Sequence, residues 1–224
     1  VGAQLDIIER LADIHEPEVI AFSDPLFGSS RPWLETFLDG LERRALPLMF
    51  WCETRADLMS REILERFKRC RFVVDFGLDT GSEAMVMRMQ KAASPGPYLA
   101  HAHETFETAN AIGLPHGIYI VFNYPGETPS TVRDTQAFID SLGAGGGPMS
   151  GFLSCQTFFI LPGTSAYSQM PHDAEAFGTE VRHKTWWKES ADHSRLAPDT
   201  LPSAAWCGRE SELTDFQRWN QEVN

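Results

Sequence analysis

The sequence predicts an α/β fold built on a parallel sheet, and three observations support this. Short apolar segments alternate along the chain with stretches of helical periodicity. These segments are apolar almost throughout, as is typical of parallel strands covered on both faces. No Gly-x-Gly-x-x-Gly turn follows any of them, which favours a barrel or partial barrel over an open dinucleotide-binding sheet. The five predicted strands are residues 17–22, 47–52, 72–78, 118–122 and 151–161.

The helices are predicted from apolar spacing and from capping residues. Leu5, Ile8 and Leu11 recur at helical spacing in the first helix. Serines suited to N-caps precede three later helices. Two further helices are predicted at 98–112 and from 129 to about 142. The capping serines are Ser30, Ser60 and Ser82.

The pattern weakens beyond about residue 170, where the chain becomes polar and rich in tryptophan. We therefore predict a barrel domain over residues 1–168. Residues 169–224 are predicted to form a mixed or helical C-terminal extension.

Composition limits the partners and the cellular compartment. The 224 residues are 42% apolar and carry a net charge of −12, which disfavours nucleic acid and anionic membranes as partners. No apolar run approaches the ~20 residues that a membrane helix needs. The cysteines are scattered, without a CxxC pair, as expected of reduced thiols in a cytoplasmic protein. They are Cys52, Cys70, Cys155 and Cys207.

Polar residues follow every predicted strand, which is where parallel α/β folds bind ligands. The set combines several carboxylates with one guanidinium. This mixture suits a zwitterionic small molecule with hydroxyl groups better than a polyphosphate. In chain order the residues are Asp24, Glu53 with Arg55, Asp79 with Ser82, Asn123 with Glu127, and the Gly163-Thr164 turn.

Each of these residues also has a purely structural explanation. Asp24 precedes a proline and suits a turn, while Arg55 and Asp57 can form a solvated pair. Asp79 and Ser82 are good helix caps, and Glu127 complements a helix dipole. The common position after strands favours the functional interpretation. No histidine or cysteine spacing indicates a metal site in this chain.

Two longer stretches resemble a known family. FGLDTGSEAMVMRMQK, followed by a helix and then by IVFNYPGET, is similar to the radical S-adenosylmethionine (radical SAM) superfamily. The resemblance is to the branch shared by cobalamin-binding radical SAM enzymes and methylthiotransferase-like proteins. It covers residues 1–168 and implies a partial (β/α)6-type barrel that lacks its first strand in this chain.

The resemblance implies a role in cofactor binding for each strand end. Asp24 would meet the amino group of the methionine moiety, and Arg55 would pair with its carboxylate. Asp79, in the segment that also holds Ser82, would bind the ribose hydroxyls. The IVFNYPGET motif would pack around the adenine through Asn123 and Gly126, while Glu127 braces the loop backbone. The backbone near Leu161, in FFILPGTSAY, would contact the adenine edge.

The chain departs from the family pattern in one large respect. The CxxxCxxC motif that holds the family's 4Fe–4S cluster is absent, and the cysteines present do not replace it by spacing. We expect the first strand and the cluster ligands to lie upstream of Val1, and this chain alone to be inactive. The branch also leaves room for an upstream cobalamin domain. A flavodoxin or ferredoxin is the expected reducing partner, and the substrate is an unknown small molecule or peptide.

Three functional hypotheses remain open from the sequence. The first is the S-adenosylmethionine-binding part of a radical SAM enzyme, whose 5′-deoxyadenosyl radical serves hydrogen abstraction or methyl or sulfur transfer. The second is a cluster-free binding or scaffold subunit of the same fold. The third is an unrelated α/β-barrel lyase or hydrolase, which needs a lysine or a carboxylate pair with a strongly shifted pKa at the strand ends.

Overall fold

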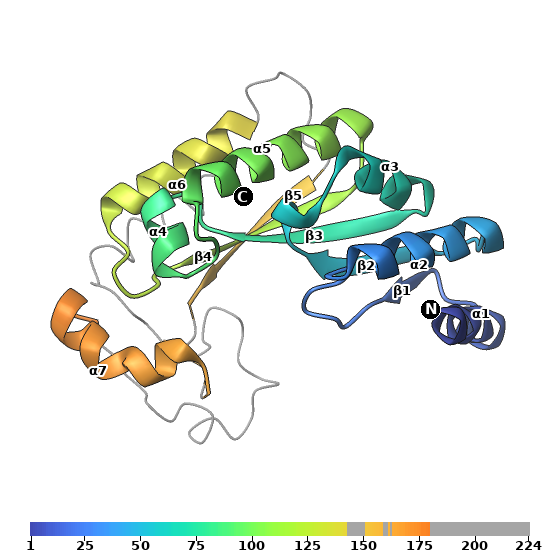
Figure 1. Cartoon of the computed structure of the whole chain (residues 1–224), viewed down its shortest axis with the longest axis horizontal. Helices are drawn as coiled ribbons and strands as arrows, with labels where there is room; N and C mark the ends of the chain where they lie inside the picture. The colour runs from blue at the N-terminus through green and yellow to red at the C-terminus, as the bar shows by residue number, and fades with distance from the viewer. Residues whose placement is uncertain (143–150, 159–160, 162, 180–224) are drawn as a thin grey trace. The chain divides into compact units, whose positions relative to one another are not determined.

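The computed structural model describes residues 1–142, 151–158, 161 and 163–179. Strands and helices alternate along this part of the chain (Figure 1). The strands are β1 Val19–Ala21, β2 Met49–Thr54, β3 Phe72–Asp79, β4 His116–Phe122 and β5 Gly151–Thr157. The helices are α1 Gly2–His15, α2 Arg31–Arg44, the short 3-10 helix η1 Ala56–Leu58, α3 Arg61–Arg69, α4 Glu83–Arg88, α5 Pro95–Ile112, α6 Pro129–Leu142 and α7 Ser165–Phe177.

The strands form one sheet in the order β1-β2-β3-β4-β5, which is also their order in the chain. Phe50 of β2 pairs in parallel with Phe72 of β3, and Val19 of β1 pairs with Met49 of β2. Helical segments return the chain to the start of each next strand, as parallel pairing requires. The predicted α/β class with five parallel strands is thereby confirmed.

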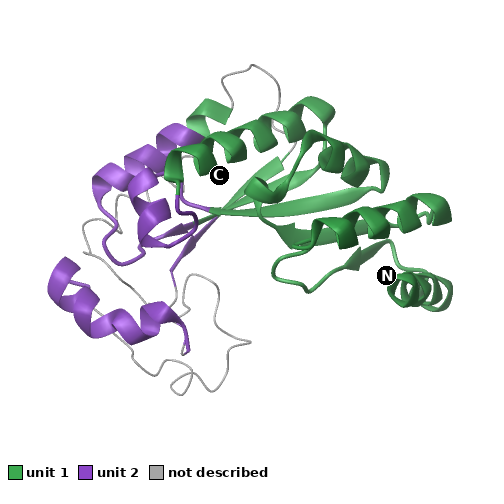
Figure 2. Cartoon of the chain, viewed as in Figure 1, with its two compact units in different colours: residues 1–78, 94–120, 139–154 green, residues 79–93, 121–138, 155–224 purple. Residues whose placement is uncertain are grey.

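The described chain divides into two compact units (Figure 2). Unit 1 contains residues 1–78, 94–120 and 139–154. Unit 2 contains residues 79–93, 121–138 and the segment from residue 155 onward.

The core of unit 1 is an aromatic cluster between the sheet and its helices. Phe37 of α2 and Phe67 of α3 are at most 1% exposed. The rings of Phe67 and Phe72 have centroids 4.8 Å apart, and those of Phe27 and Phe37 lie 5.8 Å apart. Residues at alternate strand positions face this cluster, which explains why every second residue of the strand is apolar, as at Phe72, Val74 and Phe76 of β3. Burial of these rings is the main stabilising term in the unit.

Two parts of the structure differ from the predicted elements. The last strand ends at Thr157 rather than near residue 161, and the helix α7 was not predicted. A local signal for α7 exists, because the Thr164 hydroxyl accepts a hydrogen bond from the Tyr167 N–H at 3.2 Å. The predicted helix near the C-terminus lies outside the described residues. None of the described helices is long and apolar enough to cross a membrane.

We expect Phe37→Ala to lower the free energy of unfolding by about 3–5 kcal/mol, because it opens a cavity in the aromatic cluster. Urea unfolding followed by circular dichroism measures this loss. The matched control is Ile7→Ala on α1, where the side chain is 58% exposed, and its effect should be much smaller. Equal effects of the two substitutions would contradict this account of the core.

His116 makes the stability of unit 1 sensitive to acid. Its ring is 1% exposed and lies against Phe76 and Phe106, and burial lowers its pKa below the ordinary 6.5. The unfolded chain therefore takes up a proton at a higher pH than the folded chain does. The stabilisation is present above about pH 6.5 and is lost as the pH falls through the lowered pKa of the folded state.

We expect His116→Gln to flatten the dependence of unfolding free energy on pH between about pH 5 and 7. Urea midpoints at several pH values measure the slope. The exposed His15, replaced in a His15→Gln control, should leave the slope unchanged. An unaltered slope in the His116 variant would show that other groups cause the acid sensitivity.

Candidate functional site

The predicted site residues follow, or close, five different strands. Two of them, Asp24 and Arg55, belong to unit 1, and they come after β1 and β2. The remaining six belong to unit 2, at and beyond the ends of β3, β4 and β5. These six are Asp79, Ser82, Asn123, Gly126, Glu127 and Leu161.

The loop that carries Asp24 is held at both of its ends. The Phe22 N–H donates to the Trp51 carbonyl at 2.9 Å, and the Phe27 N–H donates to the Glu53 carbonyl at 2.8 Å. The Thr54 hydroxyl donates to the Phe27 carbonyl, also at 2.8 Å. Asp24 itself is exposed at the tip of this anchored loop. Its carboxylate is therefore accessible to a ligand.

Arg55 forms a two-pronged ion pair with Asp57. Its Nε and Nη2 donate to the two carboxylate oxygens at 2.8 and 2.9 Å. The guanidinium carbon also lies 5.6 Å from the centroid of the Tyr98 ring on α5. Both charged side chains are about a quarter exposed, so the pair is partly desolvated rather than fully solvated. An external carboxylate would share or replace Asp57 on this guanidinium.

Asp79 ends β3 in an uncommon backbone conformation. Its φ is +66°, in the left-handed region that Asp and Asn enter more readily than most residues. Its Oδ2 forms an ion pair with Lys91 Nζ at 2.6 Å, and the Asp79 side chain remains 29% exposed. Lys91 therefore fixes the carboxylate while leaving part of it open. The sequence interpretation did not identify this lysine, although it lies in the stretch that carries the resemblance.

The segment after Asp79 is bound to α6 by hydroxyl groups. Ser82 stands at the N-cap of α4, as predicted, but its side chain accepts no capping bond. Its hydroxyl instead donates to Asp134 Oδ2 at 3.0 Å. The Thr80 and Thr135 hydroxyls lie 3.0 Å apart, and the Gly81 N–H donates to Thr135 Oγ1. Ser82 is fully buried, so its described contacts are structural.

Asn123 and Glu127 form a closed loop after β4. Asn123 has a φ of +65°, and its N–H donates to the Glu127 carboxylate. The Glu127 N–H donates in turn to the Tyr124 carbonyl at 2.9 Å. This is the bracing of the loop backbone that the sequence interpretation expected of Glu127. The Asn123 side chain is 6% exposed, and its Nδ2 has no hydrogen-bond partner among the described residues.

Arg88 ties this loop to α4 and α7 within unit 2. Its Nε donates to the Pro125 carbonyl at 2.8 Å, and its Nη2 pairs with the buried Asp173 at 2.7 Å. The guanidinium carbon lies 3.8 Å from the centroid of the Phe177 ring. A Cβ on Gly126 would come within 2.8 Å of Arg88 Nε, and Gly126 has a φ of +87°. Gly126 is thus required by the loop, and sequence reasoning did not identify Arg88.

Leu161 is placed by the turn into α7. Its carbonyl accepts from the Thr164 hydroxyl at 2.7 Å, and its side chain is 48% exposed. The Leu161 carbonyl is therefore bonded to Thr164, the residue that caps α7. Contact of Leu161 with a ligand stays a prediction.

A second polar cluster lies within unit 1 and was missed by sequence reasoning. Asp75, in the middle of β3, is 2% exposed. Its Oδ2 accepts from Trp51 Nε1 at 2.8 Å and from the Tyr119 hydroxyl at 2.9 Å. Its Oδ1 has no hydrogen-bond partner among the described residues. A carboxylate inside an apolar strand, VVDF, was the available sequence signal.

The described cysteines are inert thiols. Cys52 is fully buried, and burial raises its pKa far above the ordinary value. Burial also raises the pKa of Cys70 to about 11 and that of Cys155 to about 12. Thiolates are the form that binds metals and attacks electrophiles. Among the described residues no group of three or more potential ligands is arranged to hold a metal ion.

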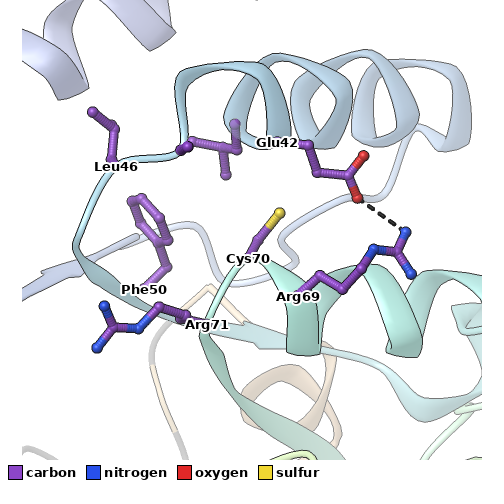
Figure 3. Close-up of a pocket in the computed structure, with 8 residues that line it drawn as sticks. Glu42, Leu46, Phe50, Arg69, Cys70 and Arg71 are labelled. Carbon is purple, nitrogen blue, oxygen red and sulfur yellow. Dashed lines mark hydrogen bonds and ion pairs between the residues drawn. The ribbon is translucent and has the colours of Figure 1, made fainter.

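A cavity of about 430 Å³ lies at the amino ends of β2 and β3 in unit 1, away from the ends of the strands where the predicted residues stand (Figure 3). Apolar side chains line it together with charged ones, and Arg69 pairs with Glu42 across it at 3.0 Å. Ligands of parallel α/β folds bind at the other end of the strands. The lining residues are Leu41, Glu42, Ala45, Leu46, Phe50, Arg69, Cys70 and Arg71.

Three solved structures of radical SAM enzymes share the fold of this chain. The radical S-adenosylmethionine methyltransferase TsrM from Kitasatospora setae, with cobalamin and a [4Fe-4S] cluster bound, matches 77% of this chain with a TM-score of 0.60 and 18% identity. A second TsrM structure, with tryptophan substrate and the SAM analog aza-SAM, matches 67% with a TM-score of 0.53 and 20% identity. The Escherichia coli coproporphyrinogen III oxidase HemN, a radical SAM enzyme, matches 98% with a TM-score of 0.59 and 10% identity.

The likeness is one of fold, and it covers part of the larger proteins. The chain spans 31% and 29% of the two TsrM chains and 44% of the HemN chain. No protein family model matches the chain, and no curated protein matches it. The predicted structural resemblance to radical SAM enzymes is confirmed at low sequence identity.

We expect Arg88→Met to loosen the loop between β4 and α6. The substitution leaves the Asp173 carboxylate buried without its guanidinium, which costs about 1–3 kcal/mol. Hydrogen exchange at the Glu127 amide should become faster than in the wild type. Arg133→Met, an exposed arginine on α6, is the matched control and should leave this exchange rate unchanged. Unaltered exchange in both variants would show that Arg88 does not hold the loop.

Proposed function

We propose that this chain binds S-adenosylmethionine as part of a radical SAM enzyme. The fold matches part of the barrel of such enzymes. The observation that carries the proposal is Asp79, a partly open carboxylate that ends β3 and is fixed by Lys91 at 2.6 Å. A carboxylate at this end of a parallel strand is suited to accept hydrogen bonds from two adjacent ribose hydroxyls.

Asn123 supports the adenosine part of this proposal. Its buried Nδ2 carries two donor hydrogens and has no partner among the described residues. Buried donors in native proteins nearly always have an acceptor, so a missing partner points to a ligand or a water. A ring nitrogen of a bound adenine is an acceptor of the required kind. Glu127 then serves the site indirectly, because it holds the Asn123 backbone.

Arg55 supports the methionine part. Its planar guanidinium is the group best suited to a two-pronged contact with a carboxylate, and Asp57 already occupies it in that manner. The amino group would meet Asp24 at the tip of its anchored loop. When bound, S-adenosylmethionine would supply the reactive carbon next to its sulfonium. These residues bind and orient it, and they take no part in bond breaking.

The described residues do not fit a 4Fe–4S cluster. Such a cluster needs three or four thiolates, and the described thiols are few, scattered and protonated. We therefore assign no cluster ligand to them and derive no step through a cluster. In the proposal, the six-stranded barrel lacks its first strand within residues 1–168, and that strand carries the ligands in a longer protein. In the proposal a reducing partner and the substrate act with that longer protein, which also leaves room for a cobalamin domain.

A cluster-free S-adenosylmethionine-binding subunit is the second candidate, and the lack of fitting thiols among the residues that the structure describes favours it. Both candidates bind the cofactor, but they differ in turnover. Anaerobic reconstitution of the longest natural protein with iron and sulfide, followed by an assay for 5′-deoxyadenosine, separates them. Production of this compound supports the enzyme, and binding without production supports the subunit.

We expect Asp79→Asn and Arg55→Ala each to weaken binding of S-adenosylmethionine by about 10- to 100-fold, because each removes a charge-assisted hydrogen bond worth about 1.5–3 kcal/mol. Isothermal titration calorimetry of the full chain measures both affinities. Near-ultraviolet circular dichroism establishes that the variants are folded.

Two neighbouring substitutions serve as matched controls for this test. Asp57→Asn releases the Arg55 guanidinium, so it should leave affinity unchanged or increase it. Glu83→Gln alters an exposed carboxylate on α4 close to Asp79 in sequence and should have no effect. Unchanged affinity in both site variants would show that Asp79 and Arg55 are structural residues only.

A further inference from the structure

Asp75 is buried more deeply than the fold itself requires. It occupies the central part of β3, between β2 and β4 (Figure 1), and is 2% exposed. Its Oδ2 holds two neutral donors, the Trp51 indole N–H and the Tyr119 hydroxyl. A buried carboxylate is destabilising unless its charge is paired and its oxygens are satisfied. Here neither condition is met among the described residues, because Oδ1 has no partner.

Gly117 packs directly against the unpaired oxygen. A Cβ at this position would lie 2.5 Å from Asp75 Oδ1 and 2.7 Å from the ring of Phe152. Oδ1 and the Phe152 ring thus both contact the Gly117 backbone, and only a glycine permits this close approach. Phe152 is 49% exposed, so its ring is a removable cover at the edge of the cluster. Rotation of this ring would open a path to Oδ1.

Around Asp75 lie a second carboxylate, aromatic rings and the buried imidazole of His116, whose pKa is lowered by burial while Asp75 acts in the opposite direction. Glu53 on β2 and Asp75 both act on Tyr119, whose pKa is raised to about 12 by burial first and by these carboxylates next. The Tyr119 and Phe152 rings have centroids 6.2 Å apart. No lysine or arginine forms an ion pair with Asp75 among the described residues. Carboxylates combined with aromatic rings are the usual protein environment for an organic cation.

We propose that Asp75, with Trp51 and Tyr119, is a recognition site for a protonated amine or amidinium group on the substrate. The cation would donate to Oδ1, while the two neutral donors on Oδ2 hold the carboxylate in place. This inference rests on the proposed function, because only that function makes the bound cation a substrate. It names the substrate class as cationic, and it assigns Asp75 to binding rather than to bond breaking.

The test uses the full chain with phenethylamine as the cationic probe and phenethyl alcohol as its neutral counterpart. The side-chain N–H resonance of Trp51, assigned through Trp51→Phe, reports on the cluster. The amine should shift this resonance saturably, and the alcohol should bind at least about tenfold more weakly, since it lacks the charge. Equal shifts with both probes, or no shift with the amine, would overturn the proposal. This comparison needs no variant of Asp75.

Variants then locate the amine contact. Asp75→Asn should weaken amine binding about tenfold or more, as should Gly117→Ala, whose methyl group would displace Oδ1 or the Phe152 ring. Glu18→Gln changes an exposed carboxylate elsewhere in unit 1 and should alter the affinity less than about twofold, as expected of a screened charge. Equal loss in the Glu18 variant would overturn the assignment to Asp75.

Binding of S-adenosylmethionine to the same samples separates this inference from the proposed function. We expect the Asp75, Gly117 and Glu18 variants to keep wild-type affinity for the cofactor. Failure of the wild type to bind the cofactor would overturn the proposed function, while the amine result would still stand as a cation site. Loss of cofactor binding in Asp75→Asn would overturn the separate substrate role of Asp75.

Discussion

Parallel pairing of the strands is the constraint on which the rest of this structure depends. A strand that pairs in parallel with its predecessor must be entered from the same end, so a crossover follows every strand. In unit 1 the helices α2, α3 and α5 provide these crossovers or pack beside them. One face of each strand is then reserved for the aromatic core around Phe67 and Phe72. Polar side chains are left to the strand ends and to the other face.

The buried polar groups fall into two kinds under this constraint. Ser82 and Thr80 find partners on α6 and so serve the fold. Asn123 Nδ2 and Asp75 Oδ1 have no partner among the described residues, although both residues are at least 94% buried. Burial without a partner opposes folding, so these atoms are better explained by ligands than by stability. They lie in different units, and each supports a proposal of its own.

The fold likeness and the chemistry of the residues contribute differently to the functional conclusion. Similarity at 10–20% identity establishes the architecture, which many unrelated activities share. Cofactor binding is therefore proposed from the chemistry of Asp79, Arg55 and Asn123.

The sequence by itself determined those features of the protein that depend on local interactions. Apolar periodicity located the strands and most of the helices, and Ser60 caps α3 by accepting from the Ile63 N–H, as its position predicted. The Glu127 carboxylate accepts from the Asn123 N–H, four residues earlier, and so braces the loop as the resemblance implied. Only the tertiary structure decided the surroundings of Asp75, because its partners come from β2 and β4, 24 and 44 residues away. Local propensity carries no information about which strands lie side by side, and through-space contacts of this kind depend on that pairing.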